Sequence, residues 1–366
     1  MQTWYTTITD IQPIPNKDRI VLATVNGFQA IVGKDTYQVG DEVVYISEAS
    51  IVPEALQEEL GLVGRLAGSS KDRVKAIKMG GVVSQGIICR PSSVWGDSNY
   101  VVEELLDSEL GITKYEPQIP IHLSGKVGRP RGNSPINPMY DIENIKKMRH
   151  QRWEHDPVSG ETVGDPWWFD PFNDKYVTIT EKLHGTNFAV HMNRGDDYVY
   201  VYSKGLGKQG HVLLEDENNT YWRALKKYPQ IIEIMRAWQH VRSITVRGEI
   251  IGQGIQDLTY GVDFDLVLFA TDYRYDSGYE GTFVAQKMFK DSGVPCVPVL
   301  WEGVYDYDKA VELSLGKNLY GTPDLHVREG VVVSCADPYR MPNGQRYAAK
   351  FINPDYLTRK GGTEYN

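Results

Sequence analysis

The N-terminal third of the chain is built from short stretches in which apolar and polar positions alternate. A period of two is typical of β-strands that bury one face, and NG, VG and GG pairs separate the stretches as turns would. Short strands joined by tight turns are typical of small barrels, so we expect an OB-like β-barrel domain over residues 1–115. The predicted strands fall within 19–32, 41–47 and 73–90, and short helices are predicted at 54–62 and 101–112.

The next segment, 116–137, contains four prolines and several glycines, a composition that indicates a linker. Helical spacing then appears at 140–153, where Ile142, Ile145 and Met148 form one apolar stripe. We therefore expect a helix here that opens the second domain.

The remaining chain mixes both periods, and we predict one α+β domain over 138–366, made of antiparallel sheets and helices. Its strands are predicted at 176–182, 187–192, 197–203, 243–251, 264–271, 328–334 and 346–352, and its helices at 215–240, 279–291 and 307–315.

Composition excludes several classes of protein. No apolar run approaches the ~20 residues of a membrane span, and the first residues lack the pattern of a secretory signal. Only three cysteines occur, at distant positions, which argues against a disulfide framework or a zinc knuckle. We expect a cytoplasmic monomer without membrane association.

The net charge of −9 excludes a uniformly basic surface for nucleic acid. Residues 121–153 nevertheless contain seven lysines and arginines against two acidic residues. This stretch is either an ordinary solvated linker and helix face or a local contact for nucleic acid. The tentative nucleic-acid residues are Lys146, Lys147, Arg149 and Arg152 in this stretch, together with Arg346 near the C-terminus.

Chemistry is concentrated in YVTITEKLHGTNFAVHM, residues 176–192, where a strand ends at Lys182 and a second strand follows Gly185 almost at once. A lysine attacks phosphorus only when it is neutral, which nearby cations or burial favour. Gly185 lets backbone approach a phosphate closely. A lone K-x-x-G pattern arises easily by chance, so it needs companions.

The companions follow in order along the chain, each placing polar or aromatic residues at a strand or strand end. They are VYSKGLGKQG (201–210), TVRGEIIGQG (245–254), FDLVLFATD (264–272), REGVVVS (328–334) and RYAAKFINPDYL (346–357). Together with EKLHGTN this series resembles the motifs of the covalent nucleotidyltransferases, the superfamily of polynucleotide ligases and capping enzymes. The fold implied is the ligase catalytic (ATP-grasp-like) domain.

Within that superfamily the chain is most similar to ATP-dependent RNA ligases of the nick-sealing RNA ligase 2 kind. His184 stands where DNA ligases and capping enzymes usually have aspartate, which is a feature of this RNA ligase group. The N-terminal region resembles the OB-type module that precedes the catalytic domain in Deinococcus-type RNA ligases, whereas DNA ligases usually carry their OB domain afterwards.

The resemblance implies roles around the nucleophile. Lys182 would form the covalent lysyl–AMP, and Glu181 would contact the adenosine. His184 would take part in the ligation reaction, although physical reasoning does not supply its role. Gly185 would border the phosphate.

Further roles follow from the companion motifs. Asn187 and Lys204 would lie near ribose or phosphate, although Lys204 stands where the family more often has arginine and lacks its two-pronged contact. Glu249 and Glu329 would bind ribose or a divalent metal, Mg²⁺ or Mn²⁺. Phe269 would stack on adenine, since a flat base suits an aromatic ring.

Lys350 would hold the α-phosphate and lower the pKa of Lys182. The family often has a second lysine two residues earlier, where this chain has Ala348, and Arg346 is the nearest substitute.

Each of these residues also has a plainer interpretation. Glu249 and Glu329 could form ordinary salt bridges, and Phe269 could belong to the core. His184 could be a loop histidine with satisfied hydrogen bonds, and Lys350 could lie on an exposed strand face.

The sequence thus predicts an ATP-dependent RNA ligase that joins a 5′-phosphate to a 3′-hydroxyl, on nicked duplex RNA or an RNA–DNA hybrid. Two alternatives stay open. One is a DNA ligase or GTP-using capping enzyme, and the other is a non-catalytic protein that binds nucleotide and RNA.

Overall fold

The computed structural model describes residues 3–95, 100, 104–116, 125–131, 134–137, 141–155, 162–278, 280–335 and 346–363, with the side chains of 150–155, 162–168 and 283 left undescribed. The chain divides into two compact units. The N-terminal unit comprises Met1–Glu116 and Lys146–Pro171, and the C-terminal unit comprises Pro117–Ile145 and Phe172–Asn366. The domain boundaries expected from the sequence stay a prediction.

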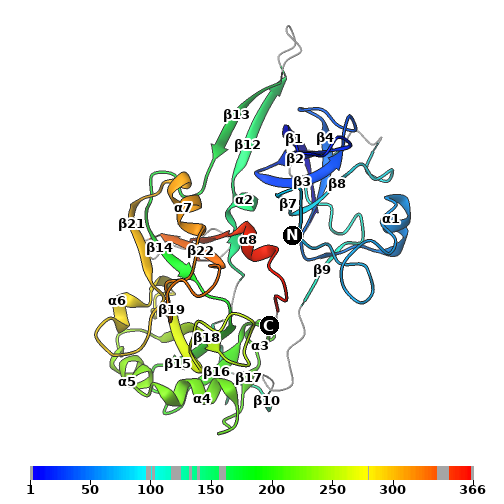
Figure 1. The fold of residues 1–366 in the computed structure, drawn as a ribbon. Helices are drawn as coiled ribbons and strands as arrows, with labels where there is room; N and C mark the ends of the chain where they lie inside the picture. The colour runs from blue at the N-terminus through cyan, green and yellow to red at the C-terminus, as the bar shows by residue number, and fades with distance from the viewer. Residues whose placement is uncertain are drawn as a thin grey trace. The chain divides into compact units, whose positions relative to one another are not determined.

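The N-terminal unit is a nearly closed antiparallel barrel, which confirms the expected OB-like architecture (Figure 1). Its core contains Ile8, Ala23, Val43 and Tyr45, the inward-facing members of alternating strands. The ends of the strand order approach each other where the Gln85 amide donates to the Gln29 carbonyl, at 2.7 Å. The order is β3 (Phe28–Gly33), β2 (Ile20–Val25), β1 (Thr3–Pro13), β4 (Glu42–Ser47) and β8 (Gly86–Cys89).

Smaller elements surround this barrel. They are β5 (Ser50–Ile51) with β9 (Thr113–Lys114), β6 (Ile77–Met79) with β7 (Val82–Ser84), helix α1 (Glu54–Glu59), and a hairpin of β12 (His150–His155) and β13 (Thr162–Phe169).

Two helix predictions in this region are wrong. The described part of 101–112 forms turns that place Leu106, Leu110 and Ile112 in a core, so their spacing reflects burial rather than a helix. In 140–153, only α2 (Ile145–Met148) is helical, between the short strand β11 (Glu143–Asn144) and β12.

The C-terminal unit contains two sheets, which confirms the α+β class. The seven-stranded sheet is antiparallel, and the five-stranded sheet contains one parallel pair, β11 with β23. The first has the order β10 (Val127–Gly128), β17 (Val212–Leu213), β16 (Tyr200–Ser203), β15 (Thr186–Asn193), β18 (Ser243–Gly252), β19 (Phe264–Arg274) and β20 (Glu280–Val284). The second has the order β11, β23 (Ala348–Ile352), β22 (Gly330–Cys335), β14 (Tyr176–Lys182) and β21 (Val299–Val304).

Helices cover one face of the seven-stranded sheet, where the main core forms (Figure 1). The expected helix at 215–240 is two helices, α4 (Thr220–Lys227) and α5 (Gln230–Ala237), because Pro229 cannot continue α4. The expected helix at 279–291 instead contains strand β20 at its start, and among its described residues only α6 (Gln286–Phe289) is helical. The other helices are α3 (Lys204–Lys208), α7 (Tyr307–Ser314) and α8 (Pro354–Leu357).

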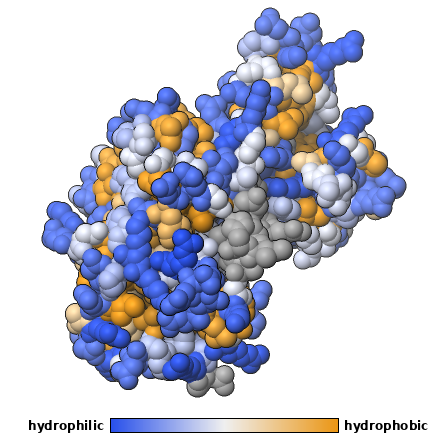
Figure 2. Space-filling view, turned by 60° about the horizontal axis from the view of Figure 1, so that its bottom comes forward, coloured by the Kyte–Doolittle hydropathy of each residue, from blue (hydrophilic) through white to orange (hydrophobic). Residues whose placement is uncertain are grey.

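Hydrophilic residues cover much of the face shown in Figure 2, and the apolar residues form small groups among them. In the described part of the chain, no helix is both long and apolar enough to cross a membrane.

Candidate active site

The turn 183–185 connects the two sheets of the C-terminal unit, because β14 ends at Lys182 and β15 begins at Thr186. Strand pairing sets the neighbours of this turn. Lys182 lies opposite Gly330 on β22, which places Glu329 beside it, and Asn187 lies opposite Glu249 on β18. Residues opposite each other share a sheet face, so distant motifs meet at one point.

Gly185 is required at this turn by its close packing. A Cβ atom there would collide with the carbonyl oxygen of Ile250 and press on the side chain of Glu249. The Gly185 amide donates to Glu249 Oε1 at 3.0 Å, so the turn and this carboxylate hold each other in place.

Lys182 points to a pair of carboxylates. Its Nζ lies 2.7 Å from Glu329 Oε1. The other oxygen, Glu329 Oε2, is buried and has no hydrogen-bond partner among the described residues. Burial raises the pKa of Glu249 to about 7, against the opposing charge of Lys182.

The pKa shifts of Lys182 and Lys350 differ from the expectation that the pKa of Lys182 is lowered. Burial lowers the pKa of Lys182, but Glu329 and Glu249 outweigh burial and raise it overall. Burial and the charge of Lys182 together lower the pKa of Lys350 to about 8. The depressed pKa that we expected on the nucleophile is therefore found on Lys350.

A cavity of about 130 Å³ opens beside this cluster. Its lining combines cations with one aromatic ring, Phe269, over which the Arg346 guanidinium carbon lies 5.7 Å from the ring centroid. Asn187 Oδ1 is buried here and has no hydrogen-bond partner in the described part of the protein. The lining residues are Asp141, Ile142, Lys182, Asn187, Lys204, Arg247, Phe269, Asp272, Arg346 and Lys350.

Glu181 is held apart from this cavity. Its carboxylate accepts the backbone N–H groups of Leu319 and Tyr320 at 2.9–3.1 Å and is almost fully buried. Burial raises the pKa of Glu181, while these hydrogen bonds oppose the change. The structure therefore gives its side chain a role in positioning the 319–320 loop.

His184 also points away from the cavity lining. Its ring bonds Tyr356 Oη through Nδ1 at 2.8 Å and Asp257 Oδ1 through Nε2 at 2.9 Å. The sequence contained no indication of these partners, because both lie more than 70 residues away.

Three further residues escaped the sequence analysis. Asp141 contacts Lys204 Nζ at 2.8 Å and Lys208 Nζ at 2.9 Å, so the first turn of the expected helix at 140–153 instead supplies an acid to the cavity. Arg247 and Asp272 form a buried ion pair in the cavity wall. Charged residues within the apolar strands TVRGEII and FDLVLFATD were a usable indication of this pair.

The tentative nucleic-acid residues are mostly bound within the N-terminal unit. Lys146 Nζ lies 3.1 Å from Gln85 Oε1, and burial lowers its pKa to about 8. Lys147 lies over the Trp4 ring at 5.5 Å, and Arg149 pairs with Asp170 at 2.8 Å. Arg346 lines the cavity instead, and the side chain of Arg152 lies outside the described residues.

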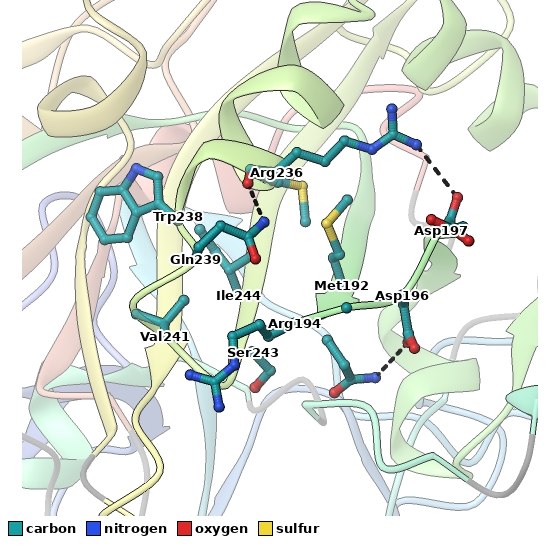
Figure 3. A pocket seen from close by; sticks show the side chains of 13 residues that line it. Met192, Arg194, Asp196, Asp197, Arg236, Trp238, Gln239, Val241, Ser243 and Ile244 are labelled. Atoms are coloured by element: carbon teal, nitrogen blue, oxygen red, sulfur yellow. Dashed lines mark hydrogen bonds between the residues drawn. The ribbon is translucent and has the colours of Figure 1, made fainter.

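A second cavity, of about 220 Å³, lies where the β15–β16 turn meets the end of α5. Figure 3 shows Arg236 directed towards Asp197, with Trp238, Val241 and Ile244 nearby. Its lining contains two arginines and two aspartates, so its charge is balanced, unlike the cation-rich cavity beside Lys182.

Comparison with known proteins assigns both parts of the chain. Residues 175–352 match the family model described as RNA ligase. These residues therefore form an RNA ligase domain. Residues 4–91 match an OB-fold domain model, which agrees with the barrel. No curated protein matches this chain.

Solved structures with the same fold include several of Naegleria gruberi RNA ligase, each 22% identical to this chain. A lysine-to-alanine variant with ATP and Mn has a TM-score of 0.74 and covers 98% of both chains. A glutamate-to-alanine variant with AMP and Mn has a TM-score of 0.72 and covers 97% of this chain and 98% of the other. The enzyme with PPi has a TM-score of 0.71 and covers 97% of both chains.

Proposed function

We propose that the protein is an ATP-dependent RNA ligase and that Lys182 is its nucleophile. The observation that carries the proposal is the meeting of Lys182, Glu329, Glu249 and Lys350 at the end of one strand, beside a cation-lined cavity with Phe269 in its wall. The structural relatives with ATP, AMP or PPi support the same chemistry.

Three steps follow for these residues. Lys182 attacks the α-phosphate of ATP, forming a phosphorus–nitrogen bond and releasing pyrophosphate. The AMP then passes to the 5′-phosphate of an RNA strand. A 3′-hydroxyl finally attacks that phosphate, AMP leaves, and a phosphodiester forms. Adenylation is needed because an unmodified 5′-phosphate has a poor leaving group.

The other cavity residues suit the parts of a nucleotide. Phe269 offers a face to adenine, and Lys350 and Lys204 offer charge to the phosphates. Asn187 offers a buried amide oxygen to a hydroxyl of the ribose. Such fixed groups stabilise charge that develops in the transition state.

The residues also fit a divalent metal. Glu329 Oε2 is a buried oxygen without a partner among the described residues. Glu249 lies close enough to Lys182 and Glu329 that their charges act on its pKa. No group of three or more His, Cys, Asp or Glu forms a metal cage in the described chain, which suits a metal shared with phosphate oxygens. When bound, Mg²⁺ or Mn²⁺ supplies positive charge for the α-phosphate and the leaving pyrophosphate.

We further propose that the substrate is a nicked RNA duplex or an RNA–DNA hybrid with 5′-phosphate and 3′-hydroxyl ends. We also propose that the protein is a monomer and that it is cytoplasmic, a compartment in which proteins with few, widely spaced cysteines are usual.

Label transfer tests the function. The protein is incubated with ATP labelled at the α-phosphate and Mn²⁺, then separated on a denaturing gel. A labelled band is expected for the wild type and not for Lys182→Ala, while Lys309→Ala, which removes an exposed lysine paired with Glu312, serves as the control. Label from GTP instead of ATP would favour a capping enzyme, and no label from either after removal of bound AMP would favour a binding protein.

A further inference from the structure

The turn after Lys182 is fixed by side chains from a single neighbouring loop and strand. The His184 amide donates to Tyr260 Oη at 2.7 Å, and Gln256 Nε2 donates to the Gly185 carbonyl at 3.1 Å. With the Glu249 contact to the Gly185 amide, three side chains hold three consecutive peptide groups. The orientation of Lys182 therefore depends on where residues 256–260 lie.

The His184 ring anchors the same turn from the opposite side. The ring is 6% exposed, and both of its nitrogens are bonded. Nδ1 lies 2.8 Å from Tyr356 Oη, and Nε2 lies 2.9 Å from Asp257 Oδ1 and 3.2 Å from Arg359 Nη2. The ring thus ties the turn to α8 and to Asp257.

Asp257 is the point where these contacts converge. Arg359 donates to both of its oxygens, from Nε to Oδ2 at 2.8 Å and from Nη2 to Oδ1 at 3.0 Å. The Thr363 amide donates to Oδ1 at 2.8 Å. Although burial raises the pKa of Asp257, these donors together lower it far below its usual range, so the carboxylate stays charged and accepts throughout.

The segment 353–363 reaches the site at both of its ends. At the start, the Asn353 amide donates to the Glu329 carbonyl at 2.9 Å. At the end, Thr363 Oγ1 lies 2.8 Å from Gln256 Oε1, and Gln256 in turn holds Gly185. One short segment therefore connects the backbone of Glu329 with the turn that carries Lys182.

We propose that Asp257 and Arg359 are positioning residues for nucleotidyl transfer, which clamp segment 353–363 against the His184 turn and so aim Lys182 at the α-phosphate. The inference rests on the proposed function, because the rate in question is that of lysyl–AMP formation. Neither residue lines the cavity, so they act through His184 and Gly185.

The test compares Asp257→Asn with Asp276→Asn. Asp276 accepts two hydrogen bonds from Arg194 at 2.8 and 2.9 Å, but this exposed pair borders the other cavity, where Figure 3 shows Arg194. Single-turnover label transfer at saturating ATP should be about 10- to 100-fold slower for Asp257→Asn, as expected for a displaced nucleophile. Its KM for ATP should stay within about twofold, and Asp276→Asn should match the wild type.

Two further readouts separate positioning from general stability. In a double-mutant cycle, Asp257→Asn should add little to the loss caused by His184→Asn, because both break the same connection. If Asp257→Asn fails to fold, Arg359→Lys takes its place in the test. This variant keeps the charge but not the two-pronged contact, so its rate of lysyl–AMP formation should fall only partly. Additive losses in the cycle, or a folded Asp257→Asn with the wild-type rate, would overturn the proposal.

Hydrogen exchange keeps the inference independent of activity. Amide exchange at His184 and Gly185 should be faster in Asp257→Asn than in the wild type or Asp276→Asn. If the wild type forms no lysyl–AMP, the proposed function fails. The structural role of Asp257 and Arg359 would be rejected separately, by equal amide exchange at His184 and Gly185 in Asp257→Asn and the wild type.

Discussion

At the residue scale, the two oxygens of Glu329 have unequal surroundings. One contacts Lys182, and the other is buried without a partner among the described residues. Burying a carboxylate oxygen without a partner costs free energy unless a cation binds it. The surroundings of Glu329 therefore suit a bound cation better than an ion pair with Lys182 alone.

We predict that Glu329→Gln lowers the rate of lysyl–AMP formation by at least about 100-fold, because the variant loses the charge that would hold a divalent metal. The rate is measured against Mn²⁺ concentration. Glu312→Gln, which removes an exposed carboxylate on α7, is the matched control. A variant with the wild-type rate and Mn²⁺ dependence would contradict the metal role of Glu329.

Gly185 gives a stability prediction at the same scale. Gly185→Ala should lower the free energy of unfolding by about 1–3 kcal/mol, because the methyl group meets the backbone of β18. Gly205→Ala in α3 meets nothing within 4 Å and should be neutral or stabilising by up to about 1 kcal/mol. Thermal unfolding of both variants measures the difference, and equal melting temperatures would contradict it.

At the element scale, the segment before α2 contributes more than a connection. Residues 143–144 add a parallel strand beside β23, and Asp141 and Ile142 line the cavity. The Asp141 carboxylate lies between the ammonium groups of Lys204 and Lys208, where an anion is favoured.

We predict that Asp141→Asn lowers the KM for ATP about fivefold, since the triphosphate no longer competes with a fixed carboxylate for these lysines. Steady-state label transfer at varied ATP measures the change. Asp306→Asn, at the N-cap of α7, controls for the loss of an acidic residue. A higher KM would instead mean that Asp141 orients Lys204 for the nucleotide.

The elements that sequence analysis predicted are those whose pattern is decided locally. Strand β14 was placed at its correct bounds, and β15, β18 and β19 within three residues, because their apolar alternation continues through the whole strand. The strand β21 was missed because its residues are largely exposed and show little alternation.

The candidate site likewise contains some residues that sequence patterns indicated and others that they did not. The residues beside Lys182 could be listed from ordered motifs, whereas the partners of His184 depend on tertiary contacts that no local pattern encodes. The contact of Glu181 with adenosine stays a prediction, and no local pattern indicated that its carboxylate accepts the amides of the 319–320 loop.

At the scale of the whole molecule, the OB-fold unit and the ligase unit have separate cores. All residues of the candidate site belong to the ligase unit. We therefore predict that the ligase unit forms lysyl–AMP and that the OB-fold unit binds RNA, because OB folds in other proteins bind nucleic-acid strands.

Removal of residues 1–116 should leave lysyl–AMP formation within about threefold of the full chain but slow the sealing of a nicked RNA duplex at least about tenfold, because phosphate contacts outside the ligase unit would be lost. Sealing is followed on gels with a labelled 5′-phosphate strand, with pre-adenylated RNA as a second substrate. If the truncated protein sealed nicks at the full-chain rate, the OB-fold unit would have no part in sealing.

The division of the chain also orders events during synthesis. The OB-fold unit is not complete at residue 116, because its last piece, Lys146–Pro171, follows residues that belong to the other unit. Lys147 cannot cover Trp4, nor Arg149 meet Asp170, until a ribosome has released the first strands of the ligase unit. At about 5–20 residues per second, synthesis of residues 117–171 takes roughly 3–11 seconds, and this surface of the barrel stays uncovered during that time.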